Sequence, residues 1–123
     1  MKNISDVLHR AQDLHAKGKI KTAIDLYLKI ISKDNKNSNV LYLLGTAYVQ
    51  QGLFEKAILN LDKSIELNPD NSHSYNVKGI ALNSLKKFND AIVNYKKAIK
   101  LKPDNFQAFN NMGISFKAIQ NFE

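Results

Sequence analysis

The chain has 123 residues, of which 44% are hydrophobic and 9% aromatic, a composition typical of folded proteins that argues against intrinsic disorder. It contains no cysteine, which excludes disulfide bonds and thiolate chemistry. The formal net charge is +7, from 17 lysines and one arginine against 11 acidic residues. No apolar run reaches the length of a signal-peptide core or a membrane span, so we expect a cytoplasmic protein without membrane contact.

Residues 4–37 are predicted to form a first pair of helices. Apolar residues recur at helical spacing on both sides of Gly18, which marks the break between the helices. Ser5 or Asp6 is expected to cap the first helix. Asp13 occupies a place that holds alanine in the later units, so we expect this helix to have no neighbour on that side.

Residues 38–71 and 72–105 repeat one pattern with a period of 34 positions. Ser38 and Ser72 are the expected N-caps, and the proline of each unit ends its second helix because proline cannot continue one. The residues at matching places are Gly45 and Gly79, Ala57 and Ala91, Leu67 and Leu101, and Pro69 and Pro103. A fixed period of this length indicates a solenoid of stacked helical units.

Two glycines stand in the middle of predicted helices, where glycine costs about 1 kcal/mol relative to alanine. Because Gly45 and Gly79 recur at the same phase, they indicate that two helices approach closely there. Ala57 and Ala91 hold the matching place on the second helices. We expect all four residues to be buried, and a bulky replacement to cost about 1–3 kcal/mol through overpacking.

Residues 106–123 repeat the first half of the pattern, with Gly113 in the glycine position. We therefore expect a half unit, a single helix whose far face shows Ile114, Ile119 and Phe122. An apolar face of this kind predicts either a longer array or an end-to-end contact with another copy of the chain.

The chain resembles the tetratricopeptide repeat (TPR) family over residues 4–123. The pattern that carries the resemblance is Leu41, Leu44, Gly45, Tyr48, Ala57, Leu61 and Pro69, followed by Tyr75, Gly79, Leu82, Ala91, Tyr95 and Pro103. The resemblance implies an all-α fold, a right-handed α-solenoid of antiparallel helix pairs with about seven helices, forming a single array over residues 1–123. First helices would line a concave groove that holds a peptide or partner protein, and second helices would form the convex side.

The resemblance also implies which residues line the partner-binding groove. They are Tyr42, Leu43, Thr46, Asn76, Val77, Ile80, Asn110 and Asn111. Apolar contacts are expected from the aromatic and aliphatic members. The amides of Asn76 and Asn111 can donate to and accept from a peptide backbone, and Asn111 alone occupies the ladder position of family members that grip peptides with asparagines.

Co-chaperone members of the family hold an acidic peptide C-terminus with a clamp of lysine, arginine and asparagine. The corresponding places carry Leu8, Gln12, Leu43, His73 and Val77. Because a carboxylate buried without charged partners is costly, we do not expect clamp function.

Sequence features that would indicate an enzyme are missing. His9, His15 and His73 are isolated, and the glycines are spread at the repeat period and form no phosphate loop, so we expect no metal, cofactor or catalytic site. Most lysines fall on the second helices and turns, where they are expected to be solvated, so no nucleic-acid partner is expected.

The predicted function is therefore a protein–protein interaction module, or scaffold, that binds a partner segment in the concave groove. One alternative is a structural module that self-associates through its open ends, including the terminal helix. Another is the N-terminal array of a larger enzyme such as a glycosyl- or sulfotransferase, which follows from the family resemblance alone.

Overall fold

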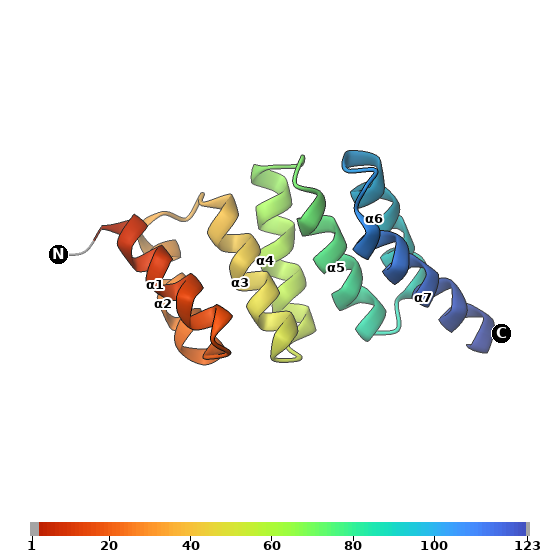
Figure 1. Ribbon diagram of the computed structural model, residues 1–123, viewed down its shortest axis with the longest axis horizontal. Helices are drawn as coiled ribbons and strands as arrows, with labels where there is room; N and C mark the ends of the chain where they lie inside the picture. Colours follow the sequence, from red (N-terminus) through yellow and green to blue (C-terminus); the bar gives the residue numbers. More distant parts are fainter. Residues whose placement is uncertain (1–2, 123) are drawn as a thin grey trace.

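The computed structural model describes residues 3–122, which form seven α-helices joined by short turns (Figure 1). The helices are α1 (Ile4–Ala16), α2 (Ile20–Lys33), α3 (Ser38–Gln50), α4 (Phe54–Leu67), α5 (Ser72–Ser84), α6 (Phe88–Leu101) and α7 (Phe106–Phe122). Helices α1, α3 and α5 each pack against the helix that follows, each pair packs against the next, and α7 packs against α6. The predicted all-α solenoid of antiparallel helix pairs is confirmed.

The turns inside the three pairs share one backbone conformation. Gly18 and Gly52 have φ angles of +81° and +76°, which glycine adopts without steric penalty. The third turn places Lys86 at φ 63°, where a side chain costs roughly 1–2 kcal/mol. The repeat therefore keeps the turn geometry even where the glycine is missing.

The N-caps lie before the residues predicted from the sequence. Asn37 caps α3, because its Oδ1 accepts a hydrogen bond of 3.1 Å from the backbone N–H of Val40. Asn71 caps α5 and Asn3 caps α1 in the same way. The predicted caps Ser5, Asp6, Ser38 and Ser72 are thus wrong, and all four residues lie inside the helices.

Ser38 and Ser72, which do not act as N-caps, instead connect the first turn of one helix to the last turn of the next helix. Ser38 Oγ donates to the backbone oxygen of Ser64 at 2.9 Å, and Ser64 Oγ donates to that of Ser38 at 2.8 Å. Ser72 Oγ donates to the backbone oxygen of Ala98 at 2.8 Å, one repeat further on. The carbonyl groups of Ser64 and Ala98 also accept a hydrogen bond from the backbone N–H of the C-cap residue, Asn68 or Lys102, so the serine hydroxyls supply a second hydrogen bond at the ends of α4 and α6.

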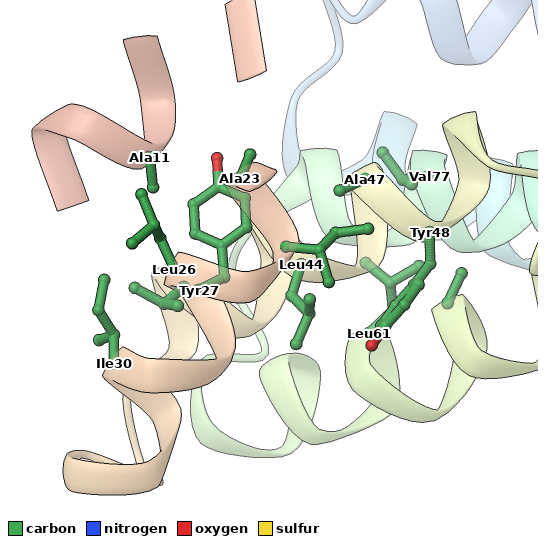
Figure 2. Close-up of a cluster of buried hydrophobic side chains, with 13 residues drawn as sticks. Ala11, Ala23, Leu26, Tyr27, Ile30, Leu44, Ala47, Tyr48, Leu61 and Val77 are labelled. Atoms are coloured by element: carbon green, nitrogen blue, oxygen red, sulfur yellow. The ribbon is translucent and has the colours of Figure 1, made fainter. Parts of the chain in front are cut away.

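Small residues allow the close packing that the repeat pattern predicts. A Cβ atom at Gly45 would lie 2.6 Å from Leu61 Cγ, and one at Gly79 would lie 2.4 Å from Tyr95 Cε1. Ala57 and Ala91 are both 0% exposed. The burial of these four positions is confirmed, and Figure 2 shows Leu61 among the apolar side chains of the first two units.

The two ends of the array differ. At the N-terminal end Asp13 is exposed and forms an ion pair of 3.0 Å with Lys17, as expected for a helix with no neighbour on that side. On α7 the exposed apolar side chains include Ile114, but Ile119 is only partly exposed, and the side chain of Phe122 lies outside the described residues. No helix within residues 3–122 is long and apolar enough to cross a membrane.

Candidate functional site

The first helices lie next to one another along the array, with α3 in contact with α5 and α5 in contact with α7. Most of the residues expected to line the groove are accessible on these helices. Tyr42, Leu43, Thr46, Ile80 and Asn111 are partly buried, and Asn110 is exposed. They offer a mixed surface of apolar side chains and amides.

Asn76 and Val77 are less accessible than a groove lining would be, at 3% and 8% exposure. Val77 belongs to the apolar cluster that contains Ala47, so it packs in the contact between α5 and α3 (Figure 2). Asn76 Oδ1 accepts a hydrogen bond of 3.1 Å from Asn111 Nδ2 on α7. Both residues therefore hold first helices together beneath the surface that a partner would touch.

Polar contacts between first helices were not foreseen from the sequence. His15, which the sequence presents as isolated, hydrogen-bonds through Nδ1 with the hydroxyl of Tyr27 at 2.8 Å and through Nε2 with Gln50 Oε1. Ser115 Oγ donates to Asn83 Oδ1 at 2.7 Å, which joins α7 to α5. The His15–Gln50 and Ser115–Asn83 bonds link residues about one repeat apart, 35 and 32 positions, and that offset is the only sequence signal that could have indicated them.

An open depression of about 370 Å³ lies on the first-helix side between α1 and α3. It is lined by Gln12, His15, Ala16, Tyr27, Leu43 and Gln50. Two of these residues, Gln12 and Leu43, belong to the first-helix surface expected from the sequence. Burial of Tyr27 raises the pKa of its hydroxyl to about 12, so the group stays protonated in the hydrogen bond to His15.

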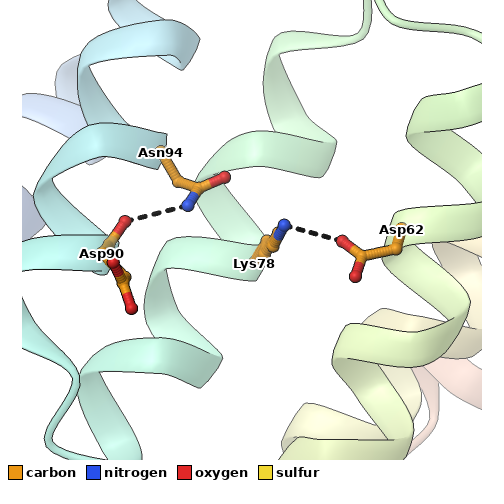
Figure 3. A network of polar contacts seen from close by, with 4 residues as sticks. All are labelled: Asp62, Lys78, Asp90 and Asn94. Carbon is orange, nitrogen blue, oxygen red and sulfur yellow. Dashed lines mark hydrogen bonds and ion pairs between the residues drawn. The ribbon is translucent and has the colours of Figure 1, made fainter.

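The first-helix surface carries little charge. Helix α3 contains no charged residue. Lys78 on α5 is directed to α4, where its Nζ lies 2.7 Å from Asp62 Oδ1 (Figure 3). Figure 3 also shows Asn94 donating to the backbone oxygen of Asp90 within α6, at 2.9 Å. These groups stay outside the surface formed by Tyr42 and its neighbours.

The five places of the co-chaperone clamp hold no permanent cation. Gln12 and His73 are exposed, Leu8 and Leu43 are partly buried, and Val77 is buried. An acidic peptide end would therefore meet aliphatic groups, an amide and the imidazole of His73 here. No group of three or more histidine, aspartate or glutamate residues within residues 3–122 is arranged to hold a metal ion.

A second depression, about 450 Å³, lies at the N-terminal end between α1 and α2, and no motif in the sequence indicates it. Its floor is apolar and includes Leu26 and Ile30, and Arg10, Lys29 and Lys33 stand at its edge. It is separate from the first-helix surface on which α3, α5 and α7 meet.

Two family models match the sequence. The model described as TPR repeat matches residues 79–120, and the model described as anaphase-promoting complex, cyclosome, subunit 3 matches residues 16–98. No curated protein matches the sequence significantly.

Solved TPR domains share the fold over nearly the whole chain. The first TPR domain of Spaghetti (RPAP3), bound to the HSP90 peptide SRMEEVD, has a TM-score of 0.91 and 25% identity, covering 95% of this chain and 93% of that chain. The second TPR domain of human RPAP3, in complex with the HSP70 peptide SGPTIEEVD, has a TM-score of 0.83 and 25% identity, covering 87% and 89%. The Sgt2 TPR domain from Aspergillus fumigatus has a TM-score of 0.90 and 20% identity, covering 98% and 81%.

The helix pairs, the buried glycines at a constant phase, the family models and the shared fold all agree. The chain belongs to the tetratricopeptide repeat family.

Proposed function

We propose that this TPR domain is an interaction module that binds an extended segment of a partner protein on its first-helix surface. The observation that carries the proposal is the accessible row of apolar and amide side chains on α3, α5 and α7. Apolar groups supply affinity, and amides recognise a peptide backbone because they both donate and accept hydrogen bonds. This combination suits a peptide better than a small charged ligand.

Tyr42 and Ile80 are the expected apolar anchors. Both are partly exposed and stand on neighbouring helices, while Val77 beneath them is buried and fixes the distance between the helices. Aromatic residues that are already held by packing lose little freedom on binding, which is why they often dominate binding energy.

Asn110 and Asn111 are the expected polar contacts. Asn111 uses one of its amide hydrogens in the bond to Asn76, which fixes its orientation and leaves its remaining polar groups for a ligand. Asn110 is exposed on the same helix. A partner backbone that passes over α7 would therefore meet the oriented amide of Asn111 and the exposed amide of Asn110.

The partner segment differs in charge from those of the RPAP3 domains. The peptides SRMEEVD and SGPTIEEVD each contain two glutamates and one aspartate. The clamp places of this chain carry no lysine or arginine, and a desolvated carboxylate without a cation is unfavourable. The proposed ligand is thus an uncharged, apolar-rich segment.

The proposal can be tested with peptides selected from a displayed random library on the immobilised chain. Binding of a labelled selected peptide is then measured by fluorescence anisotropy. The variant Tyr42→Ala/Ile80→Ala should weaken binding at least tenfold, because each truncated anchor contributes about 1 kcal/mol or more. The peptide SRMEEVD should bind more weakly than the selected peptide.

The matched control is Leu59→Ala/Val93→Ala, which truncates two exposed apolar residues on second helices. It should change affinity less than twofold. Equal loss in both variants, tight binding of SRMEEVD, or unchanged affinity of the Tyr42/Ile80 variant at wild-type helicity would show that the first-helix surface is not the binding site.

A further inference from the structure

The depression at the N-terminal end lies within a single helix pair. We call this depression of about 450 Å³ the α1/α2 pocket, and its apolar lining consists of Ile4 and Val7 on α1 and Leu26 and Ile30 on α2. Leu26 and Ile30 are buried members of the apolar cluster of the first two units (Figure 2). The pocket therefore reaches down to the core of the array.

Three of the apolar lining residues are particular to the first unit. Ile4, Leu26 and Ile30 stand where the second unit has Ser38, Asn60 and Ser64 and the third has Ser72, Asn94 and Ala98. In the second unit, hydrogen bonds between the two serines tie the start of α3 to the end of α4. Isoleucine side chains have no polar atom and cannot form such bonds. The pocket lies where this link between paired helices is missing.

A preceding repeat does not account for the apolar lining. The second and third units each follow another helix pair, yet they hold serine, asparagine or alanine at these three places. Helix α1 also carries two exposed carboxylates, Asp6 and Asp13. The matching residues of α3 are Val40 and Ala47, which are buried. A further helix packed on α1 would have to desolvate both carboxylates, which is unfavourable.

The edge of the pocket is positively charged. Arg10 on α1 and Lys29 and Lys33 on α2 stand there, and none of the described lining residues is acidic. Within residues 3–122, none of these three cations forms an ion pair. Positive charges that lie beside an apolar floor without a counterion attract an anion that carries an apolar group.

We infer that the α1/α2 pocket binds a single-chain aliphatic carboxylate, with the chain on the apolar floor and the carboxylate at the three cations. The volume falls within the range of about 300–1,000 Å³ that is usual for small-molecule sites. Helix α7 of a second copy is not a complementary occupant, because its single charged residue, Lys117, is a cation. The pocket is separate from the first-helix surface, so this inference does not depend on the proposed peptide binding.

Chain length should determine affinity, and charge should determine selectivity. Each methylene group that is fully buried contributes about fourfold to the binding constant. Arg10 can hold a carboxylate through two parallel hydrogen bonds, and Lys29 and Lys33 are four residues apart, which places them on one face of α2. Because the three cations are exposed, solvent and salt weaken their contribution.

The inference can be tested with sodium decanoate below its micellar concentration. Binding to the isotope-labelled full chain is followed by nuclear magnetic resonance, and the largest amide shifts should fall on residues that line the pocket. Octanoate, which is two methylenes shorter, should bind about tenfold more weakly. Decanol and decyltrimethylammonium, which have the same chain with a neutral or a cationic head, should bind at least threefold more weakly than decanoate.

Two matched variants test the role of the cations. Lys29→Gln/Lys33→Gln should weaken decanoate binding at least threefold, and both lysines are exposed, so the fold should be kept. The control Lys63→Gln/Lys100→Gln removes the same charge from exposed positions of α4 and α6 and should change affinity less than twofold. Val7→Phe fills the pocket from α1 and should abolish binding at wild-type helicity.

Four results would overturn the inference. They are equal binding of decanoate and decanol, equal loss in the two lysine variants, shifts centred on the first-helix surface, and unchanged binding by Val7→Phe. Self-association in analytical ultracentrifugation that Val7→Phe abolishes and decanoate leaves unchanged would show that a second copy fills the pocket, which would also overturn it.

Discussion

Alanine at Gly45, Gly79 and Gly113 separates helix propensity from packing, because the three glycines hold the same place in successive first helices. In an open helix, replacing glycine by alanine stabilises by about 1 kcal/mol. At Gly113 nothing lies within 4 Å of the new Cβ, so that gain should appear almost in full. At Gly79 the Cβ would stand 2.4 Å from a ring carbon of Tyr95, which is 1% exposed and cannot swing away.

Overpacking of this kind costs about 1–3 kcal/mol, so after the propensity gain Gly79→Ala should destabilise by roughly 0–2 kcal/mol. Gly45→Ala should behave similarly, because its Cβ would meet Leu61 Cγ at 2.6 Å and the backbone oxygen of Ala57 at 3.3 Å. The difference between Gly113→Ala and Gly79→Ala should therefore be about 1–3 kcal/mol.

The assay is urea unfolding followed by circular dichroism at 222 nm, at a concentration low enough to keep the chain monomeric. The free energy of unfolding is compared among the three variants and the wild type, provided that the denaturant slope is unchanged. A stabilised Gly79→Ala variant, or a destabilised Gly113→Ala variant, would refute the reasoning that packing alone distinguishes the three sites.

Three further changes follow from buried or paired polar groups. Ser74 Oγ is buried without a hydrogen-bond partner, so Ser74→Ala should raise the free energy of unfolding by about 1 kcal/mol in the same assay; a loss would contradict this. Burial raises the pKa of Tyr27 and Tyr95 from 10.0 to about 12. As the pH rises, the two hydroxyls therefore ionise in the unfolded chain at a lower pH than in the folded chain. Stability should be complete below pH 10 and fall between pH 10 and 12, by up to about 2–3 kcal/mol per tyrosine, and Tyr27→Phe should reduce that slope in urea titrations at each pH. Lys78→Met should change the free energy of unfolding by less than about 1 kcal/mol, because the ion pair with half-exposed Asp62 is weak. A larger decrease in that free energy would show that the ion pair contributes more to stability.

The helix pairs and the close packing between them could be predicted from the sequence because both depend on residues that recur at a constant phase. A glycine in the middle of a helical pattern indicates that another helix approaches closely, and the structure places both Gly45 and Gly79 against the following helix. The N-caps of the helices could not be predicted as accurately. Asparagine followed by serine offers two good caps in a row, and the chain uses the asparagine because the serine reaches the end of another helix.

The groove was harder to predict because accessibility depends on neighbouring repeats. From the sequence, an asparagine in a first helix is expected to be exposed. Asn76 is nevertheless buried, and it accepts a hydrogen bond from Asn111, a residue one repeat away. The uncovered face of α7 shows the same difficulty. Periodicity indicated Ile114, Ile119 and Phe122. Among the side chains that the structure describes, however, the most exposed large apolar residue is Phe106, at the place where Ser72 bonds to the next helix.

The contacts between successive first helices differ in kind along the array. Hydrogen bonds join α1 to α3 through His15 and Gln50, and α5 to α7 through Asn76 and Asn111. Among the described residues, α3 and α5 meet instead through apolar groups such as Val77, with no side-chain hydrogen bond between them. Hydrogen bonds are directional and resist sliding, whereas apolar contacts keep most of their energy when surfaces shift slightly. Burial of apolar groups therefore sets the spacing of α3 and α5 beneath Tyr42, whereas side-chain hydrogen bonds contribute at the other two contacts between first helices.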